Sequence, residues 1–163
     1  MSRGFKFCEY AKTISSAKLP TRSTQGSAGY DFYCLEDVTI PSHLNMFLNS
    51  DNNMFNVVKP FCIKTGIKAF MEKDEVLQIY IRSSSPSKLG LILANSVGII
   101  DSDYYDNVDN EGEIGFLVYN LTPYAINLKQ GDKIGQGIFT KYLTIWDDNA
   151  NNIRMGGFGS TDN

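Results

Sequence analysis

The chain has 163 residues, a formal net charge of −3, 42% hydrophobic residues and 20% charged residues. This length and composition predict one soluble globular domain with a substantial core. The acidic balance excludes the broad basic surface of a nucleic-acid-binding protein, and no apolar run is long enough to span a membrane. The polar N-terminus does not resemble a signal peptide. Three cysteines, Cys8, Cys34 and Cys62, form no CxxC pair, so we expect a reducing, cytoplasmic setting without disulfides or a zinc site.

Short segments rich in β-branched and aromatic residues follow one another along the chain. PFCIKTGIKAF (60–70), VLQIYI (76–81), EIGFLVYN (113–120) and KIGQGIFTKYLTI (133–145) have the composition of strands. Apolar and polar residues alternate in 76–81 and 113–120, which is typical of strands with one buried face. Glycines and prolines separate the segments, and no long stretch shows helical periodicity. The pattern predicts an all-β fold, either a sandwich, a jelly roll or a barrel.

Two polar segments look inserted into this pattern. Residues 42–56 are rich in Asn and Ser and are expected to form a loop, with at most one short helix. The single histidine, His43, is expected to be exposed there, and its isolation argues against a catalytic triad or a multi-histidine metal site. Residues 105–111 form the second insertion. The core is predicted to span 1–146, and the polar, then Gly-rich tail at 147–163 is expected to stay mobile or to fold over a ligand.

Carboxylates gather in GIIDSDYYDNVDNEGEIG, residues 98–115, which has six acids in the thirteen residues from Asp101 to Glu113 and contains no Lys or Arg. They could form a solvated loop, a metal site, or one catalytic acid beside a polar loop. Asp101 follows an apolar run, and a half-desolvated carboxylate there could orient or deprotonate a water. An Asp that caps its own turn is the common alternative. An EF-hand is excluded because its glycine position would hold Asp106 and its glutamate position Gly112.

Three other stretches could bind a ligand, although each has a simpler interpretation. RSSSPSKLG (82–90) offers Arg, three serines and Lys as a phosphate cradle, but it lacks P-loop spacing and could be a surface turn. RMGGFGSTDN (154–163) could wrap backbone N–H groups around phosphates, or it could be a disordered terminus. SAGYDF (27–32) alone indicates only a turn that enters a strand.

Taken together, these motifs resemble the trimeric dUTPase family. Five short blocks stand in the family's order: AGYDF (28–32), RSSSPSKLG (82–90), NSVGIIDSDYY (95–105), GDKIGQ (131–136) and GGFGSTD (156–162). The resemblance implies a β jelly roll that forms a homotrimer, with active sites built from three chains and a C-terminal arm that closes over a neighbour's site. It implies Mg²⁺-assisted hydrolysis of dUTP to dUMP and pyrophosphate, which limits uracil incorporation into DNA and supplies dUMP for dTMP synthesis.

The resemblance also implies roles for individual residues. Asp101 matches the aspartate that activates water for attack on the α-phosphorus, and it is the one acid of the six that we expect to do chemistry. Tyr104 matches the tyrosine that packs under the deoxyribose and excludes a 2′-hydroxyl. Asp31 matches an aspartate that holds Mg²⁺ through water, and Asp103 is expected to support the turn. The other implied contacts are Asn95, Gly98, Ile99 and Ile100 on uracil, Arg82, Ser83, Ser84 and Gln136 on phosphates, and Arg154, Phe158, Gly159, Ser160 and Thr161 of the arm on uracil and the γ-phosphate.

Two alternatives stay open beside this interpretation. A dCTP deaminase has the same fold but needs an acid–base glutamate beside the base, for which Glu113 is the candidate. A nucleotide-responsive binding protein could use the insertions 42–56 and 105–111 to contact a protein partner. Many members of the family have only a residue or two in place of the insertion 105–111. The longer segment of this chain is similar to that of members from Gram-positive bacteria and their phages. Lys133 departs from the family pattern, since many relatives have Arg there, and Arg and Lys are not equivalent in bidentate contacts.

Overall fold

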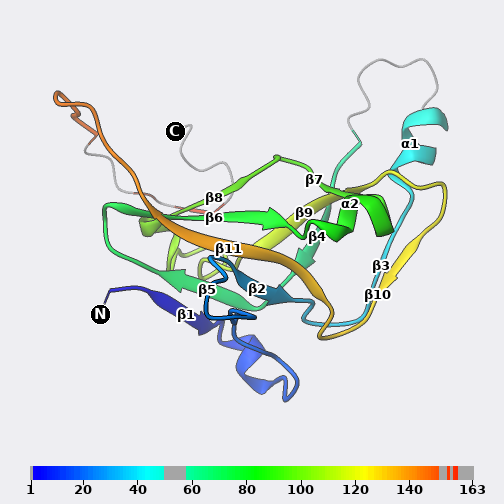
Figure 1. Ribbon diagram of the computed structural model, residues 1–163, viewed down its shortest axis with the longest axis horizontal. Coiled ribbons are helices and arrows are strands. Elements are labelled where there is room, and N and C mark those ends of the chain that lie inside the picture. Colours follow the sequence, from blue (N-terminus) through cyan, green and yellow to red (C-terminus); the bar gives the residue numbers. More distant parts are fainter. Residues whose placement is uncertain (1, 50–57, 151–153, 155, 158–163) are drawn as a thin grey trace.

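The structure is a computed structural model that describes residues 2–49, 58–150, 154, 156 and 157 (Figure 1). The strands are β1 (Gly4–Phe7), β2 (Tyr30–Tyr33), β3 (Val38–Ile40), β4 (Phe61–Lys64), β5 (Ile67–Phe70), β6 (Glu75–Ile81), β7 (Leu91–Leu93), β8 (Gly98–Asp101), β9 (Gly115–Asn120), β10 (Ile126–Leu128) and β11 (Lys133–Lys141). The helices are α1 (His43–Asn49) and α2 (Ser84–Leu89), with 3-10 turns at Tyr10–Thr13 and Ser102–Tyr104. No helix within the described ranges is long and apolar enough to cross a membrane. The predicted all-β class is confirmed.

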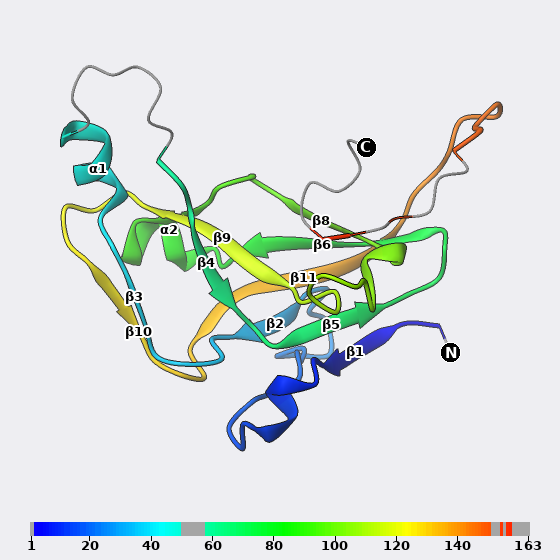
Figure 2. The same ribbon diagram turned by 180° about the vertical axis from the view of Figure 1, so that it is seen from behind.

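Two antiparallel sheets form the body of the molecule. One has the strand order β2-β11-β6-β8 and the other β4-β9-β7, while β1 pairs with β5 and β3 with β10. β6 and β11 lie in front in Figure 1, and β4 and β9 lie in front when the molecule is seen from behind in Figure 2. The rings of Phe32 on β2 and Phe116 on β9 meet edge to face at 5.5 Å between centroids, so the core lies between these sheets.

The alternation predicted for β6 and β9 is confirmed by burial. Leu77 and Ile79 of β6 are 0% and 3% exposed, and Phe116 and Val118 of β9 are both fully buried. Each such side chain removed from water contributes roughly 1.5–3 kcal/mol to folding. Successive side chains point to opposite faces of a strand, so the apolar residues at every second position form the inner face of each sheet.

The strand-like segment 60–70 forms two strands, β4 and β5, that separate at Gly66. Gly66 has φ +66°, and a Cβ there would lie 2.6 Å from the Cβ of Ala11. Only glycine adopts this left-handed conformation at low cost. The break lets β4 pair with β9 while β5 pairs with β1.

His43 is buried, so the prediction that it is exposed was wrong. Its side chain is 1% exposed, its Nδ1 accepts a hydrogen bond from the backbone N–H of Asn120 at 3.0 Å, and its ring meets Tyr119 edge to face at 5.3 Å. The one short helix that the sequence allowed in this insertion forms as α1, so the preferred loop interpretation does not hold for residues 43–49. The Oγ of Ser42 accepts from the N–H of Asn45 at 3.0 Å and caps the helix. Residues 50–57 of the insertion lie outside the described part of the chain.

The side chain of Asn120 ties this region together and gives a stability prediction. It is fully buried, and its Nδ2 donates to the carbonyls of Ile40 (3.2 Å) and Tyr124 (2.7 Å), while its Oδ1 accepts from the N–H of Thr122 at 2.9 Å. Asn120→Ala leaves these groups unpaired and is expected to lower the free energy of unfolding by about 3 kcal/mol in a urea titration. The exposed Asn127→Ala is the control, with an expected loss of about 0.5 kcal/mol or less. Equal losses in the two variants would contradict this role.

Candidate active site

Asp101 stands at the end of β8, on a partly apolar surface. In the ladder between β8 and β6 it lies opposite Val76. Its side chain is 52% exposed, Ile99 is 54% exposed and Ile100 is buried. Val76, Ile99, Asp101 and Tyr142 line a cavity of about 230 Å³. The half-exposed carboxylate therefore faces an open space that a small ligand or a water can enter.

The tail residue Arg154 lies on this surface. Its Nη1 is 3.1 Å from Oδ2 of Asp101 and 3.1 Å from Oδ1 of Asp103, and its guanidinium carbon is 5.2 Å from the centre of the Tyr104 ring. Burial alone would lower the pKa of Arg154, but the hydrogen bonds to Asp103 and Asp101 raise it overall. We call Asp101, Asp103, Tyr104 and Arg154 the Asp101 cluster. Asp103, expected only to support the turn, also binds the tail.

The carboxylates of the insertion are also paired, by groups far away in the sequence. Lys68 binds Asp106 and, at 3.2 Å, Glu111, and the N–H of Gly157 donates to Oδ2 of Asp109 at 2.8 Å. No group of three or more potential metal-ligating side chains occurs among the described residues. The acidic stretch is therefore a polar loop that is bound to the rest of the protein, in which Asp101, Asp103 and Asp106 are each about half exposed (52%, 57% and 54%). The assignment of Asp101 as the catalytic acid stays a prediction.

The hairpin before Asp101 is tight. Ser96 has φ +61°, and the N–H of Val97 donates to the carbonyl of Asn95 at 2.6 Å. A Cβ at Gly98 would lie 2.4 Å from Cγ1 of Ile79, so only glycine lets β8 lie against β6 at this point. The hairpin thus presents backbone groups in a fixed arrangement, which is what selective recognition of a base edge requires.

A second cluster lies at the other end of the first sheet. In the ladder between β11 and β2, Gln136 is opposite Asp31. Lys133 reaches Asp31 Oδ2 at 2.6 Å and Ser23 Oγ at 2.9 Å, and Arg82 Nη1 lies 3.5 Å from the carbonyl of Lys133. We call Arg82, Gln136, Asp31 and Lys133 the Arg82 cluster. It places two cations and an amide beside one carboxylate, a set suited to phosphate oxygens.

The serines that follow Arg82 belong to a helix rather than to a plain turn. Ser83 is the N-cap of α2 and Ser84 its first residue, and the N–H of Ser85 donates to the carbonyl of Arg82 at 2.9 Å. Ser83 is exposed, so its hydroxyl is available to a ligand at the Arg82 cluster. The four predicted arm contacts Phe158, Gly159, Ser160 and Thr161 lie outside the described part of the chain.

The two clusters are far apart within one chain. Asp101 pairs with Val76 near the start of β6, and Arg82 follows the end of the same strand. Six residues of extended strand correspond to about 20 Å. A single chain therefore does not bring the predicted catalytic acid and the predicted phosphate contacts into one site.

Asp31 is suited to a hydrated cation but not to a closed metal site. Burial alone would raise the pKa of Asp31, but hydrogen bonds from Lys133 and Ser23 lower it overall, so the carboxylate stays charged near neutral pH. Mg²⁺ keeps several waters and is often held by one carboxylate together with substrate phosphates. Asp31 fits that outer role, with most ligands coming from elsewhere.

Comparison with known proteins decides the family. The family model described as dUTPase matches residues 15–162. The chain belongs to the dUTPase family. The deoxyuridine 5′-triphosphate nucleotidohydrolase of Lactococcus lactis subsp. lactis (strain IL1403) is 40% identical over 162 residues, which cover 98% of this chain and 97% of that protein.

Solved dUTPase structures share the fold. The crystal structure of dUTPase from Streptococcus mutans matches with a TM-score of 0.73 and 36% identity, covering 87% of this chain and 98% of that one. A variant of dUTPase from phage phi11 of S. aureus, described as revealing the coordination of a structural Mg(II) ion, matches with a TM-score of 0.66 and 17% identity, covering 93% and 98%. The similarity to the phage protein concerns the fold alone.

Glu113, the acid–base candidate for a dCTP deaminase, has a structural task in this dUTPase-family chain. Its Oε1 accepts from the N–H of Gly66 at 3.1 Å and from the hydroxyl of Tyr10. These contacts hold the turn between β4 and β5 against the 3-10 turn that follows β1. The geometry therefore gives no support to the deaminase alternative.

Sequence reasoning missed two residues beside the Asp101 cluster. Asn110 donates to the hydroxyl of Tyr104 at 2.8 Å, and Asp109 receives the tail at Gly157. Both lie in the insertion 105–111, for which the dUTPase pattern offers no counterpart. A polar loop of this composition has no feature that separates an inward-facing Asn from a solvated one, so no sequence signal could have found them.

Proposed function

We propose that this chain hydrolyses dUTP to dUMP and pyrophosphate at sites completed by neighbouring copies of itself. The activity is that of the family to which the chain belongs. The observation that supports shared sites is the separation of about 20 Å between Asp101 and Arg82 along β6. The α- and γ-phosphates of one nucleotide cannot reach both groups on a single chain, so we infer that the Asp101 cluster of one copy faces the Arg82 cluster of another.

Asp101 has the surroundings that a general base needs. It is half exposed beside Ile99 and next to a cavity, so it can hold a water and accept its proton as the water attacks the α-phosphorus. Phosphoryl transfer of this kind depends mostly on positioning and on neutralisation of charge. Tyr104 would support the deoxyribose with its ring, and the hairpin 95–98 would recognise uracil through its backbone.

The Arg82 cluster supplies the opposite charge. Arg82, Ser83, Ser84 and Gln136 would donate hydrogen bonds to the phosphate oxygens, and Lys133 adds a second cation at the same end of the sheet. Mg²⁺ bound to the triphosphate would neutralise part of its charge, with Asp31 as an outer partner. Arg154 of the arm would move from the carboxylates toward the nucleotide.

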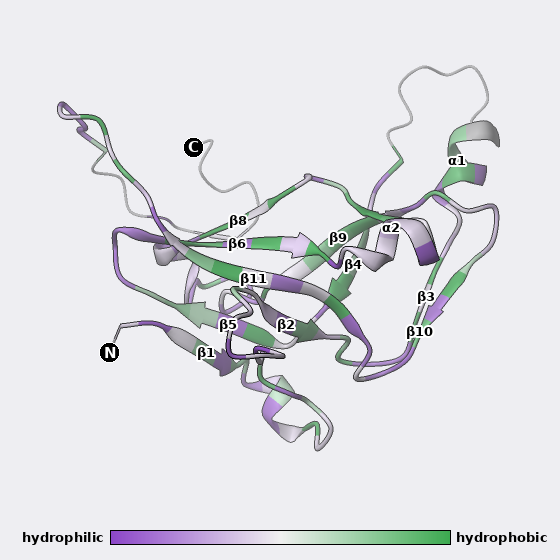
Figure 3. Ribbon diagram, in the orientation of Figure 1, coloured by the Kyte–Doolittle hydropathy of each residue, from purple (hydrophilic) through white to green (hydrophobic). Residues whose placement is uncertain are grey.

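The segment after β11 supports assembly into a trimer. Leu143, Ile145 and Trp146 are 97%, 71% and 96% exposed. Figure 3 shows the chain after β11 extending away from the body of the molecule, with apolar residues along it. Contiguous exposed apolar surface marks an interaction site, and a strand exchanged between copies would cover it.

The cysteines bear on the cellular compartment, and the contacts of the insertions bear on a possible protein partner. All three cysteines are free thiols, which fits the reducing cytoplasm. A protein partner at the insertions 42–56 and 105–111 stays a prediction. The contacts of 105–111 with Lys68 and Gly157 are within the chain and do not support it.

A pyrophosphate-release assay tests the proposed function. With Mg²⁺ present, dUTP is expected to be hydrolysed with a kcat/KM at least about 100-fold above those for UTP, dTTP and dCTP. Chelation of Mg²⁺ is expected to reduce the dUTP rate strongly, and no ammonia should form from dCTP. Equal rates on UTP and dUTP, or ammonia release from dCTP, would contradict the proposal.

A further inference from the structure

The insertion 105–111 encloses the phenol of Tyr104. The Nδ2 of Asn110 donates to the Tyr104 hydroxyl at 2.8 Å, and the hydroxyl donates to the carbonyl of Glu113 at 3.0 Å. The side chain of Tyr104 is 4% exposed, and burial raises the pKa of its phenol above the ordinary value, so the hydroxyl remains a donor. A hydroxyl that both donates and accepts is fixed in direction, and the ring to which it is attached is fixed with it.

Asn110 is itself held by the loop. Its Oδ1 accepts from Asn107 Nδ2 at 2.8 Å and from the N–H of Gly112 at 3.1 Å. Asn107 also donates to the carbonyl of Tyr104 at 2.9 Å and accepts from the N–H of Asn110 at 3.2 Å. The amide oxygen and nitrogen of both Asn107 and Asn110 therefore have hydrogen-bond partners. A side-chain network whose groups are all paired is rigid.

The backbone of the loop adopts conformations that need this support. Asp106 and Glu111 have φ of +56° and +59°, a region that residues other than glycine rarely adopt. Lys68 binds the carboxylates of both, and the N–H of Glu9 donates to Oε2 of Glu111 at 3.1 Å. Burial alone would lower the pKa of Lys68, but hydrogen bonds to Asp106 and Glu111 raise it overall, so the ammonium stays charged.

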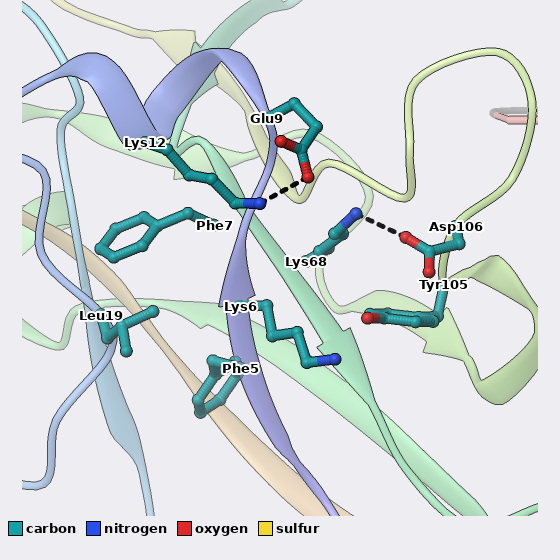
Figure 4. Close-up of a pocket in the computed structure, with 9 residues that line it drawn as sticks. All are labelled: Phe5, Lys6, Phe7, Glu9, Lys12, Leu19, Lys68, Tyr105 and Asp106. Carbon is teal, nitrogen blue, oxygen red and sulfur yellow. Dashed lines mark hydrogen bonds and ion pairs between the residues drawn. The ribbon is translucent and has the colours of Figure 1, made fainter.

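Figure 4 shows this anchor from the side of a cavity of about 420 Å³. Lys68 points to Asp106, and the ring of Tyr105 lies beneath, with its centre 5.4 Å from the Lys68 ammonium. The Tyr105 ring also packs against Phe70 of β5 at 6.0 Å between centroids. The start of the insertion is therefore fastened to the core strand β5, and its far side reaches Tyr104.

The same loop receives the tail. Asp109 Oδ2 accepts from the N–H of Gly157 at 2.8 Å, and a Cβ built on Gly157 would lie 3.5 Å from Asn110 Nδ2. One residue of the loop thus contacts the arm while the next holds Tyr104. Arg154, in the same tail, lies over the Tyr104 ring, with its guanidinium carbon 5.2 Å from the ring centre.

We propose that the insertion 105–111 is a positioning element of the active site, in which Asn110 fixes the Tyr104 ring and so sets the discrimination between deoxyribose and ribose nucleotides. Tyr104 can exclude a 2′-hydroxyl only if its ring cannot retreat, and the hydrogen bond from Asn110 prevents that retreat. The proposal rests on the proposed function. It differs from a tolerated surface loop because the loop's amide groups face inward, whereas Val108, at its tip, is 86% exposed.

A double-mutant cycle on the trimeric protein tests this inference. The readout is the ratio of kcat/KM for dUTP to that for UTP in wild type, Asn110→Ala, Tyr104→Phe and the double variant. Each single change is expected to lower the ratio by about tenfold, and Asn110→Ala is expected to have no further effect once the Tyr104 hydroxyl is gone. Val108→Ala is the matched loop control and should leave the ratio unchanged.

A conservative variant tests positioning by rescue. Asn110→Asp keeps the oxygen that holds Asn107 and Gly112, and the Tyr104 hydroxyl can turn to donate to its other carboxylate oxygen, so the ratio is expected to stay nearer to wild type than in Asn110→Ala. An unchanged ratio in Asn110→Ala, or equal losses with and without the Tyr104 hydroxyl, would overturn the inference. Failure of the wild type to release pyrophosphate from dUTP would instead overturn the proposed function.

Discussion

Replacing Asp101 with asparagine is expected to lower kcat for dUTP by about 1,000-fold, the contribution typical of a positioned general base. Asparagine has almost the same volume and the site is half exposed, so the cavity and the ladder with β6 should persist. Nucleotide binding is therefore expected to stay within about threefold of wild type, because the change withdraws a proton acceptor without removing a substrate contact.

Asp103→Asn is the matched control. Asp103 lies as close to Arg154 as Asp101 does, at 3.1 Å, and is similarly exposed. Its replacement should therefore reproduce any loss caused by a weaker contact with Arg154 but not the loss of the base. Single-turnover pyrophosphate release and titration with a non-hydrolysable dUTP analogue provide the two readouts. A near-normal rate in Asp101→Asn, or an equal loss in Asp103→Asn, would refute the assignment.

Arg82→Ala is expected to lower kcat/KM for dUTP by about 100-fold, since charge-assisted hydrogen bonds to phosphate contribute about 1.5–3 kcal/mol each. Arg82→Lys should recover part of this loss, because it keeps the charge but not the planar fork. Lys59→Ala, an exposed cation outside the segment 82–90, is the control and should have little effect. If Arg82→Ala keeps the wild-type kcat/KM, the phosphates do not bind at this end of the sheet.

Local pattern was enough for the strands but not for the features that depend on distant partners. The alternation in β6 and β9 appears directly in the sequence, because one face of each strand packs in the core. The burial of His43 depends on the N–H of Asn120, which lies 77 residues away. Gly66 itself signals a turn, but the pairing of β4 with β9 and of β5 with β1 depends on strands far away in the sequence. Neither partner can be recognised from residues near the feature.

The candidate site shows the same division. The family blocks pointed to Asp101, Tyr104 and Arg82 from the sequence, and the structure places Asp101 and Arg82 at strand ends and Tyr104 in the 3-10 turn after β8. Their separation into two clusters follows from the register of β8 on β6, which no motif encodes. The neutralisation of the acidic stretch by Lys68 and Arg154 was likewise hidden, because neither cation lies within it.

Shared sites between copies are the central claim, and complementation between two inactive variants tests it most directly. Asp101→Asn and Arg82→Ala chains, carrying different tags, are refolded together in equal amounts, and trimers that contain both tags are isolated. If each site takes Asp101 from one copy and Arg82 from another, one of the three sites in every mixed trimer is intact, so about a third of wild-type activity should return. Activity no higher than the mean of the two variants refolded separately would show that one chain supplies both residues and would contradict the account.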